Sequence, residues 1–297
     1  MLIALAPGCN QVFDLESTTP VVQDADLRPD LDHDQIADED DPCLASTIDL
    51  TGDFDSDLIA NADDPCPLDV TVSGASDGDT IPDTCDPFPT LADDHARCMM
   101  TFRNPDLNQA LWRTRAGDVP WTLEAGLYTP SGVTSTLLAS STIEAPTTTT
   151  FEVHALMMLE VPAPPTLGLT LWVRAGEVAS STDVGCELSG GTTSIRLAVV
   201  GPGATASQTE GKPFRNGFRL RATVEPGAAP GLPNLRCEAV VFDGSGGKIA
   251  VAPVAAAVAL PSGSFGFTAQ TGSAAASSSL GIYALVTYDR PDAPALP

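Results

Sequence analysis

In the second half of the chain, apolar residues alternate with polar ones, which is the pattern of half-buried β-strands. A period of two places successive side chains on opposite faces of a sheet. Few helical patterns compete, so the alternation predicts an all-β fold, an antiparallel sandwich with one wet face. The alternating segments, bounded by Gly, Pro and Ser, are residues 151–155, 167–173, 195–199, 218–224, 235–241 and 282–286.

The pattern changes near Met99, and before this residue the chain has little apolar content. We therefore expect four parts: a signal remnant (residues 1–9), a polar tether (10–27), a repeat segment that forms an irregular stalk (28–98) and the β-sandwich (99–297). Roughly 200 residues are enough to bury a sizeable core in one sandwich. Trp112 and Trp121 are expected in that core.

The repeat segment contains one phrase of alternating carboxylates three times. The copies begin at Asp32, Asp55 and Asp77, which are 23 and 22 residues apart. Each copy also has an Ile at a fixed offset and a closing Asp-Pro. Ca²⁺ is a hard cation that takes six to eight oxygen ligands and accepts carboxylates from alternate residues of a curling loop. The phrase therefore predicts calcium-binding loops.

The oxygen donors match positions 1, 3, 5, 7, 9 and 12 of an EF-hand loop, with a backbone carbonyl at position 7. The first copy offers Asp30, Asp32, Asp34, the Ile36 carbonyl, Asp38 and Asp41. The second offers Asp53, Asp55, Asp57, the Ile59 carbonyl, Asn61 and Asp64. The third offers Asp77, Asp79, the Ile81 carbonyl, Asp83 and Asp86.

Some positions depart from the EF-hand pattern. Ala75 stands at position 1 of the third copy, so this copy should bind most weakly or borrow an oxygen from a neighbour. Gln35, Leu58 and Thr80 replace the usual Gly at position 6. Each costs about 1 kcal/mol if that position needs a positive φ. The Pro after the closing Asp disfavours an exiting helix, so the pattern predicts a helix-free variant.

These phrases resemble thrombospondin type 3 repeats over roughly residues 30–89. The resemblance implies that the acids named above wrap Ca²⁺ ions with little secondary structure. It also implies that disulfides link neighbouring repeats.

Acidic residues are concentrated in the same segment. Residues 1–98 hold 24 of the 39 Asp and Glu residues, against Arg28 and Arg97. Nucleic acid is not an expected partner, because binding it relies on Lys and Arg that neutralise phosphates. The other interpretation of an acidic run is a solvated, disordered tail. The regular spacing, with an Ile and a Cys in each phrase, favours calcium loops.

The first eight residues are mainly apolar and end at Cys9, which resembles the end of a bacterial lipoprotein signal. We therefore expect lipidation of Cys9, and an exported protein held at the outer membrane or cell surface by a lipid anchor only. The other interpretation is an ordinary apolar end, since a basic region is missing. No other run reaches the roughly 20 apolar residues that cross a bilayer.

The remaining six cysteines are an even number, as in an oxidised exported chain. The simplest pairing keeps to the two segments: Cys43–Cys66, Cys85–Cys98 and Cys186–Cys237. The sequence leaves the connectivity open. A zinc site is the competing interpretation, but the chain has no Cys-x-x-Cys and only three His.

Residues 111–127 and 266–286 resemble the first and last strands of concanavalin A-like lectin/glucanase and laminin-G-like jelly rolls. The glucanases of this family carry Glu-x-Asp-x-x-Glu on one strand, which is absent here. Glu152 is interpreted as a solvated strand residue, and His154 as a surface side chain without a Gly-x-Ser-x-Gly motif. We therefore do not expect an enzyme, with a glycoside hydrolase as the less favoured alternative.

Trp172 is the candidate for ligand binding, because Thr170, Trp172 and Arg174 share the polar face of one strand. The indole could stack on a sugar ring while Arg219 or Arg221 donates hydrogen bonds. A Trp covered by a loop is the favoured interpretation, since large aromatics are mostly buried.

The sequence as a whole predicts a calcium-binding, surface-anchored exported protein with a lectin-like binding or adhesion domain. Its partner would be a glycan or a cell-surface protein. The alternatives are a polysaccharide hydrolase or its accessory module, and a structural envelope protein without a small ligand.

Overall fold

The computed structural model describes the sandwich and most of the second and third aspartate loops. The predicted ligands of the first loop, from Asp30 to Asp41, lie outside the described residues, as do Cys9, Cys43, the tether and the Cys98 side chain. The described residues are 29, 37, 53, 55–61, 64–66, 74–79, 81–83, 85–92, 95–102, 109, 111–124, 127–130, 134–139, 148–158, 167–191, 193–204, 206–214, 217–229, 232–242, 247–271 and 279–289.

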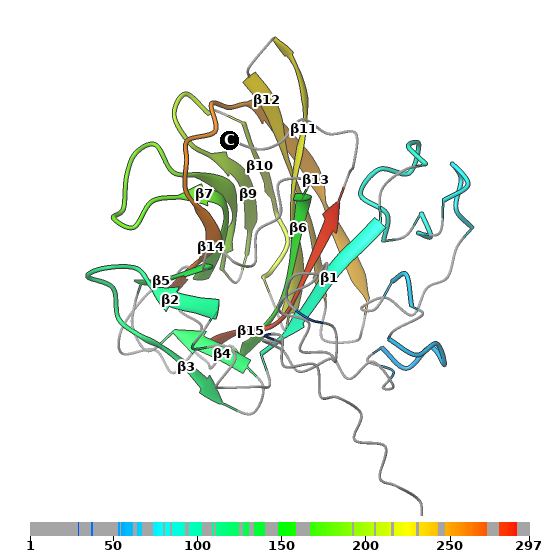
Figure 1. Ribbon diagram of the computed structural model, residues 1–297. Coiled ribbons are helices and arrows are strands. Elements are labelled where there is room, and N and C mark those ends of the chain that lie inside the picture. Colours follow the sequence, from blue (N-terminus) through cyan, green and yellow to red (C-terminus); the bar gives the residue numbers. More distant parts are fainter. Residues whose placement is uncertain are drawn as a thin grey trace, which may run out of the picture.

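Two antiparallel sheets pack face to face in a jelly-roll sandwich (Figure 1). The eight-stranded sheet, sheet A, has the order β13 (Lys248–Ala257), β12 (Leu232–Phe242), β11 (Gly217–Ala229), β6 (Thr148–Met158), β15 (Ser279–Asp289), β4 (Leu127–Pro130) and β3 (Trp121–Glu124), with β1 (His95–Thr101) also paired to β15. The seven-stranded sheet, sheet B, has the order β10 (Ser207–Glu210), β9 (Ile195–Val200), β8 (Val184–Gly190), β7 (Leu167–Ala175), β14 (Ser264–Thr271), β5 (Thr134–Ala139) and β2 (Trp112–Thr114).

The alternation in the sequence explains this architecture. All six alternating segments form strands, and the apolar positions of the first five meet between the two sheets in one core. In the last segment Ile282 and Leu285 join that core, whereas Ala284 and Val286 face the outer side of sheet A, because the pairing of β15 with β6 shifts register between Ile282 and Ala284. Trp112 and Trp121 belong to that core, as predicted. The predicted disulfide Cys186–Cys237 is confirmed, and it joins β8 of sheet B to β12 of sheet A. Among the described residues, no helix has the length and apolar character needed to span a membrane.

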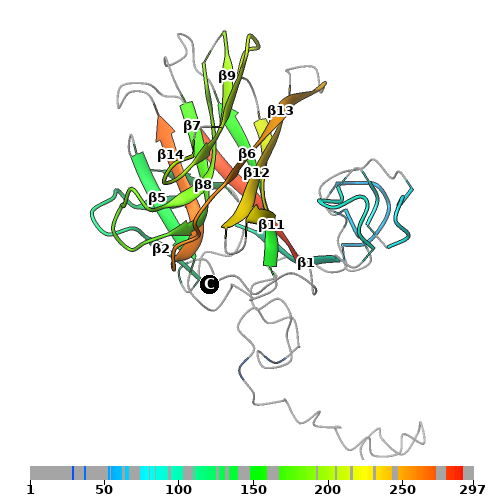
Figure 2. The same ribbon diagram turned by 90° about the horizontal axis from the view of Figure 1, so that it is seen from above.

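The second and third aspartate loops lie beside the outer face of sheet A (cyan and blue in Figures 1 and 2). Their described residues form no separate core and instead share a small one with the sheet. Its buried members are Cys66, Ile81, Cys85, Met99, Ala284, Val286 and Tyr288. Strand β1 leads directly from the loops into sheet A and crosses the expected domain boundary at residue 98.

A disulfide between Cys66 and Cys85 lies in this small core. The pairs Cys43–Cys66 and Cys85–Cys98 predicted from the sequence are therefore wrong. The simple rule of pairing along the segment fails because the ends of the second and third loops pack on the same patch of sheet A. This packing brings the α-carbons of Cys66 and Cys85 within 5.8 Å.

The outer face of sheet A is not wet where the loops cover it. Glu152 of β6 is 2% exposed, and its carboxylate accepts a hydrogen bond from Arg221 Nε of β11 at 2.5 Å. His154 is equally buried, with Nε2 2.8 Å from Glu152 Oε1. The interpretations of Glu152 as solvated and of His154 as a surface side chain are therefore wrong. Polar alternate positions show only that a face is outside the main core, and here a second layer covers it.

This burial predicts a pH-dependent stability. Desolvation lowers the pKa of His154 below its usual 6.5, although Glu152 opposes the shift and Arg219 and Arg221 add to it. Below pH 6.5 the unfolded chain takes up a proton at this position and the folded chain does not. The contribution of neutral His154 to stability is therefore present above pH 6.5 and lost as the pH falls toward its folded pKa.

We expect the free energy of unfolding to fall between pH 7 and pH 5 more steeply in the wild type than in His154→Gln, by up to about 1.4 kcal/mol per pH unit. Urea unfolding at a series of pH values measures this difference. The Gln side chain keeps a donor for Glu152, and the aspartates titrate in both proteins, so they cancel. Equal pH slopes in the two proteins would contradict the prediction.

Candidate functional site

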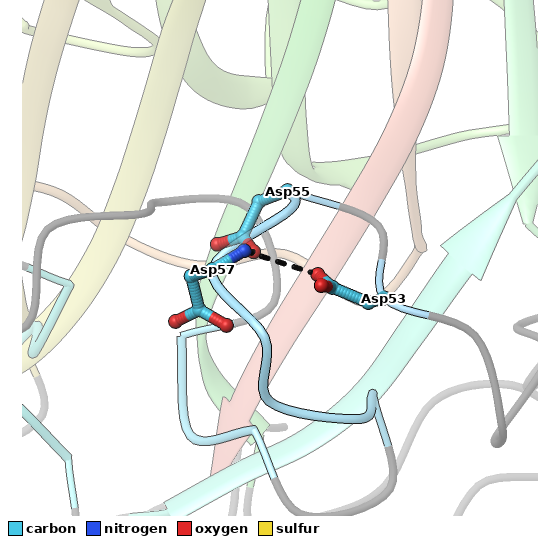
Figure 3. A group of neighbouring side chains, drawn as sticks. All are labelled: Asp53, Asp55 and Asp57. Atoms are coloured by element: carbon cyan, nitrogen blue, oxygen red, sulfur yellow. Dashed lines mark hydrogen bonds between the residues drawn. The ribbon is translucent and has the colours of Figure 1, made fainter.

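Three aspartates of the second loop point toward one another (Figure 3). One carboxylate oxygen from each of Asp53, Asp55 and Asp57 lies within 4.8 Å of the other two. Asp53 shapes the loop, because its Oδ1 accepts hydrogen bonds from the N–H of Ser56 at 2.7 Å and of Asp57 at 3.2 Å. Its Oδ2 accepts one from the N–H of Leu58 at 2.9 Å. The backbone therefore curls around the first aspartate and brings the next two beside it.

Each later aspartate divides its two oxygens between two tasks. Asp55 Oδ1 accepts the N–H of Asp57, and Asp57 Oδ1 accepts the N–H of Ile59, two residues further in each case. The Oδ2 atoms of Asp55 and Asp57 are buried and have no hydrogen-bond partner among the described residues. One oxygen thus fixes the turn, and the other is left without a proton donor.

Asp64, at position 12, is not one of the three aspartates within 4.8 Å, but its charge acts on that of Asp55. Its Oδ1 accepts the N–H of Cys66 at 2.7 Å, whereas Oδ2 has no hydrogen-bond partner within the described part of the chain. Asp64 is only 7% exposed. Burial, followed by the charges of Asp64 and Asp57, raises the pKa of Asp55 to about 6. Burial likewise raises the pKa of Asp64. These four carboxylates are thus close enough to repel one another.

The third loop repeats the arrangement with Asp77, Asp79 and Asp86, whose oxygens also lie within 4.8 Å of one another. Asp77 Oδ1 accepts the N–H of Asp79, Asp79 Oδ1 that of Ile81, and Asp86 Oδ1 that of Phe88. The Ile81 side chain is buried in the small core that the loops share with sheet A. The sequence had placed all three aspartates in one site.

Asp83, the predicted ligand at position 9, is engaged elsewhere. Its two oxygens accept the N–H and the hydroxyl of Ser76, at 2.8 and 2.5 Å, and these bonds lower its pKa. The Ile59 and Ile81 carbonyls and Asn61 lie in the described loops, and as metal ligands they stay predictions.

Calcium fits these loops on the chemistry of their donors. All the available atoms are hard oxygens, and carboxylates about 5 Å apart repel by roughly 3 kcal/mol per pair at an effective dielectric of 20. Buried oxygens without donors are costly in a folded protein. A divalent cation would remove both costs, because it would take the second oxygens of Asp55, Asp57 and Asp64 and neutralise the shared charge.

The backbone stores strain at two positions of the second loop. Ser56 at position 4 has φ 67° and Leu58 at position 6 has φ 76°, both in the left-handed region. The third loop places Gly78, with φ 90°, at the equivalent position 4. The expectation that Leu58 occupies a conformation suited to glycine is therefore confirmed. Its side chain is 94% exposed, so packing does not compensate for the strain.

The structure does not bring together the four residues proposed to bind a ligand. Trp172 and Arg174 lie on β7 of sheet B, whereas Arg219 and Arg221 lie on β11 of sheet A. The outer faces of the two sheets look in opposite directions, so the set cannot contact one small ligand. Arg221 is also buried under the third loop. Arg174 is buried too, and its Nη1 donates to the Val173 carbonyl.

Trp172 itself is half-buried on the outer face of sheet B. Its Nε1 donates to Thr268 Oγ1 at 2.6 Å, and the guanidinium carbon of Arg115 lies 5.9 Å from the centroid of its ring. Gly185 of β8 makes room for the ring, because a Cβ there would lie 3.0 Å from Trp172 Cε3. The indole is therefore held in place by β8, β14 and Arg115.

Arg115 is a residue that the sequence pattern missed. It forms a buried ion pair with Asp183 at 2.8 Å, and its Nε donates to the Gly176 carbonyl. Asp183 also accepts the N–H groups of Gly176 and Ser180. This network fixes the loop between β7 and β8 next to Trp172. An isolated Arg in a turn carries no sequence signal that would reveal a partner 68 residues away.

Comparisons with known proteins give only low similarity. No family model matches the chain, and no curated protein matches it significantly. A legume lectin-like domain from Entamoeba histolytica has a TM-score of 0.45 at 11% identity, and the match covers 64% of this chain and 97% of that domain. Peanut lectin with a nonapeptide has a TM-score of 0.43 at 11% identity, and the match covers 67% and 98%. The lectin UEA-II complexed with galactose has a TM-score of 0.43 at 14% identity, and the match covers 66% and 100%.

The strain at Leu58 yields a prediction for cation binding. Leu58→Gly should strengthen calcium binding by up to about fivefold, since glycine removes about 1 kcal/mol of strain at a positive φ. Leu58→Ala is the matched control, because it removes the exposed side chain and keeps the β-carbon. Calorimetric titration of both variants measures the difference. If alanine strengthens binding as much as glycine does, strain is not the cause.

Proposed function

We propose that this chain is an exported calcium-binding protein in which the aspartate loops hold Ca²⁺ against a β-sandwich that binds a ligand. The observation that carries the calcium part is the buried Oδ2 of Asp64, which has no hydrogen-bond partner among the described residues and lies near Asp53, Asp55 and Asp57. The repeated phrase and its resemblance to thrombospondin type 3 repeats support the same cation.

We propose further that acyl chains on Cys9 hold the protein at the outer membrane or the cell surface. The support comes from the sequence, where an apolar run ends at Cys9. Disulfides fit an oxidising compartment, and both Cys66–Cys85 and Cys186–Cys237 are formed. An extracellular site also supplies the millimolar Ca²⁺ that weak modules need.

A glycan is the ligand class that we propose for the sandwich, bound on the outer face of sheet B. The supporting observation is the half-buried Trp172 on the outer face of sheet B, where Glu187 of β8 lies opposite Thr170, two residues from Trp172. Glu187 on β8 accepts hydrogen bonds from Arg196 at 2.8 Å and from Ser189 at 3.0 Å. An aromatic face next to hydrogen-bonding groups suits a sugar ring, which has an apolar face and a polar rim. Adhesion to a cell surface through such a glycan would follow.

Polysaccharide hydrolysis is less well supported. Retaining hydrolysis needs two carboxyl groups about 5–5.5 Å apart, one of them protonated. Glu152 is buried, but the positive charges of Arg221 and Arg219 outweigh the burial and hold its pKa well below its usual value. It therefore stays ionised and bonded to Arg221, and it cannot serve as a general acid.

Calcium binding is tested by calorimetry on the full chain. We expect dissociation constants of about 0.1–1 mM, as in extracellular modules. Asp64→Asn should weaken binding at the second loop by about tenfold, because it removes one charged ligand. Asp118→Asn, which removes a carboxylate from a sandwich turn, should leave binding unchanged. The absence of any calcium heat up to about 10 mM would refute the proposal.

Glycan binding is tested on a glycan array with and without chelator. We expect binding to one sugar class that Trp172→Ala abolishes and Trp172→Phe partly retains, because phenylalanine keeps an aromatic face for stacking. If no glycan on the array binds while calcium binding is intact, the glycan proposal is wrong. That result would favour a structural envelope protein without a small ligand.

A further inference from the structure

Arg221 bonds at the same time to sheet A and to the end of the third loop. Its Nε donates to Glu152 Oε2 at 2.5 Å, its Nη2 to the Cys85 carbonyl at 2.7 Å, and its Nη1 to the Asp86 carbonyl at 3.2 Å. The side chain is nearly buried, at 7% exposure for the residue. All three guanidinium nitrogens are thus used, one toward the sheet and two toward the loop.

The two carbonyls belong to the segment that carries the proposed calcium ligands. Asp86 is itself a member of the third-loop group. Cys85 is bonded through its disulfide to Cys66, whose N–H donates to the buried carboxylate of Asp64 in the second loop. Arg221 therefore reaches the third loop directly and the second loop through the disulfide.

Sheet A and the aspartate loops each lose stabilising contacts when they separate. If the loops leave sheet A, Arg221 loses two hydrogen-bond acceptors, and the apolar patch around Tyr288 and Val286 loses its cover. If no cation holds the loops, their aspartates repel one another and the carbonyls of Cys85 and Asp86 lose the frame that positions them. Burial opposes the charge on Arg221, but the Glu152 carboxylate outweighs it and raises the pKa of Arg221. The Arg221 guanidinium therefore stays charged at physiological pH.

We propose that Arg221 couples calcium binding in the aspartate loops to the stability of the β-sandwich. Cation binding orders the Cys85 and Asp86 carbonyls, which accept hydrogen bonds from Arg221. In turn, these hydrogen bonds hold the loops in the conformation that binds the cation. This inference rests on the proposed function, because it requires the loops to bind Ca²⁺. Linkage makes the effect reciprocal: the factor by which docking tightens calcium binding equals the factor by which calcium strengthens docking.

The test compares the wild type with the double variant Glu152→Gln/Arg221→Met. Both charges are removed together, so no buried charge is left unpaired, and the Gln oxygen still accepts from His154. Calorimetry measures calcium affinity, and tryptophan fluorescence measures unfolding of the sandwich, where all three Trp residues lie. We expect the double variant to bind Ca²⁺ about 5- to 10-fold more weakly. We also expect calcium to raise the melting temperature of the wild-type sandwich and to leave that of the variant unchanged.

The matched control is Glu225→Gln/Arg236→Met. It removes an ion pair with an N–O distance of 3.3 Å from the same sheet with no net charge change, and it keeps Glu238, which lies opposite Arg221 in the pairing of β11 with β12. Wild-type calcium affinity and a wild-type melting shift are expected there. If the Glu152 variant fails to fold, Arg221→Lys replaces it, because Lys keeps the charge but cannot grip two carbonyls and a carboxylate in one plane.

The outcomes separate the two proposals. Calcium binding in the wild type, with affinity and melting shift preserved within about twofold in the Arg221 variants, would overturn the coupling and leave the calcium function standing. A wild type that binds no Ca²⁺ would overturn both. An equal loss in the control variant would mean that any ion pair on sheet A has this effect, which also contradicts a specific role for Arg221.

Discussion

The aspartate loops contain more carboxylate oxygens than the backbone can satisfy, and the rest of their structure depends on this imbalance. In the second loop, Asp55, Asp57 and Asp64 each use one oxygen to accept an N–H two residues further along. Their second oxygens are buried and find no donor among the described residues. Such an arrangement is costly unless a positive charge lies at the centre. A bound cation, as proposed above, would supply that charge and would hold the segment together in place of a large hydrophobic core.

Ions alone do not explain where the loops lie. The small core under the Cys66–Cys85 disulfide is shared with Met99 of β1 and with Val286 and Tyr288 of β15. The loops supply few apolar atoms to it, and sheet A supplies the remainder. As a result, the outer face of sheet A is an internal surface wherever the loops cover it. This explains why a charged residue such as Glu152 is found there fully paired and almost fully buried.

The sequence predicted the features that depend on local periodicity. Alternation located the six segments that form strands, and the spacing of the carboxylates placed Asp53, Asp55 and Asp57 in one group and Asp77, Asp79 and Asp86 in another. It also identified Leu58 as a strained position. The errors and omissions concern contacts between segments that are not neighbours in the sequence. No local rule indicates that Cys66 pairs with Cys85, or that Arg115 meets Asp183.

Local patterns also could not show that the four residues proposed to bind a ligand lie on different sheets. Alternation showed correctly that Trp172 and Arg221 leave the main core, but it does not tell what each side chain meets outside. Arg221 contacts the third loop, and two of its guanidinium nitrogens donate hydrogen bonds to carbonyls of that loop. Trp172 meets only Thr268, Arg115 and the backbone of β8 among the contacts described, and it keeps part of its surface in water. The two outer faces of the sandwich are therefore not equivalent. Near β6, β11 and β15, the loops cover the outer face of sheet A. A ligand that needs an open aromatic surface would therefore bind on sheet B.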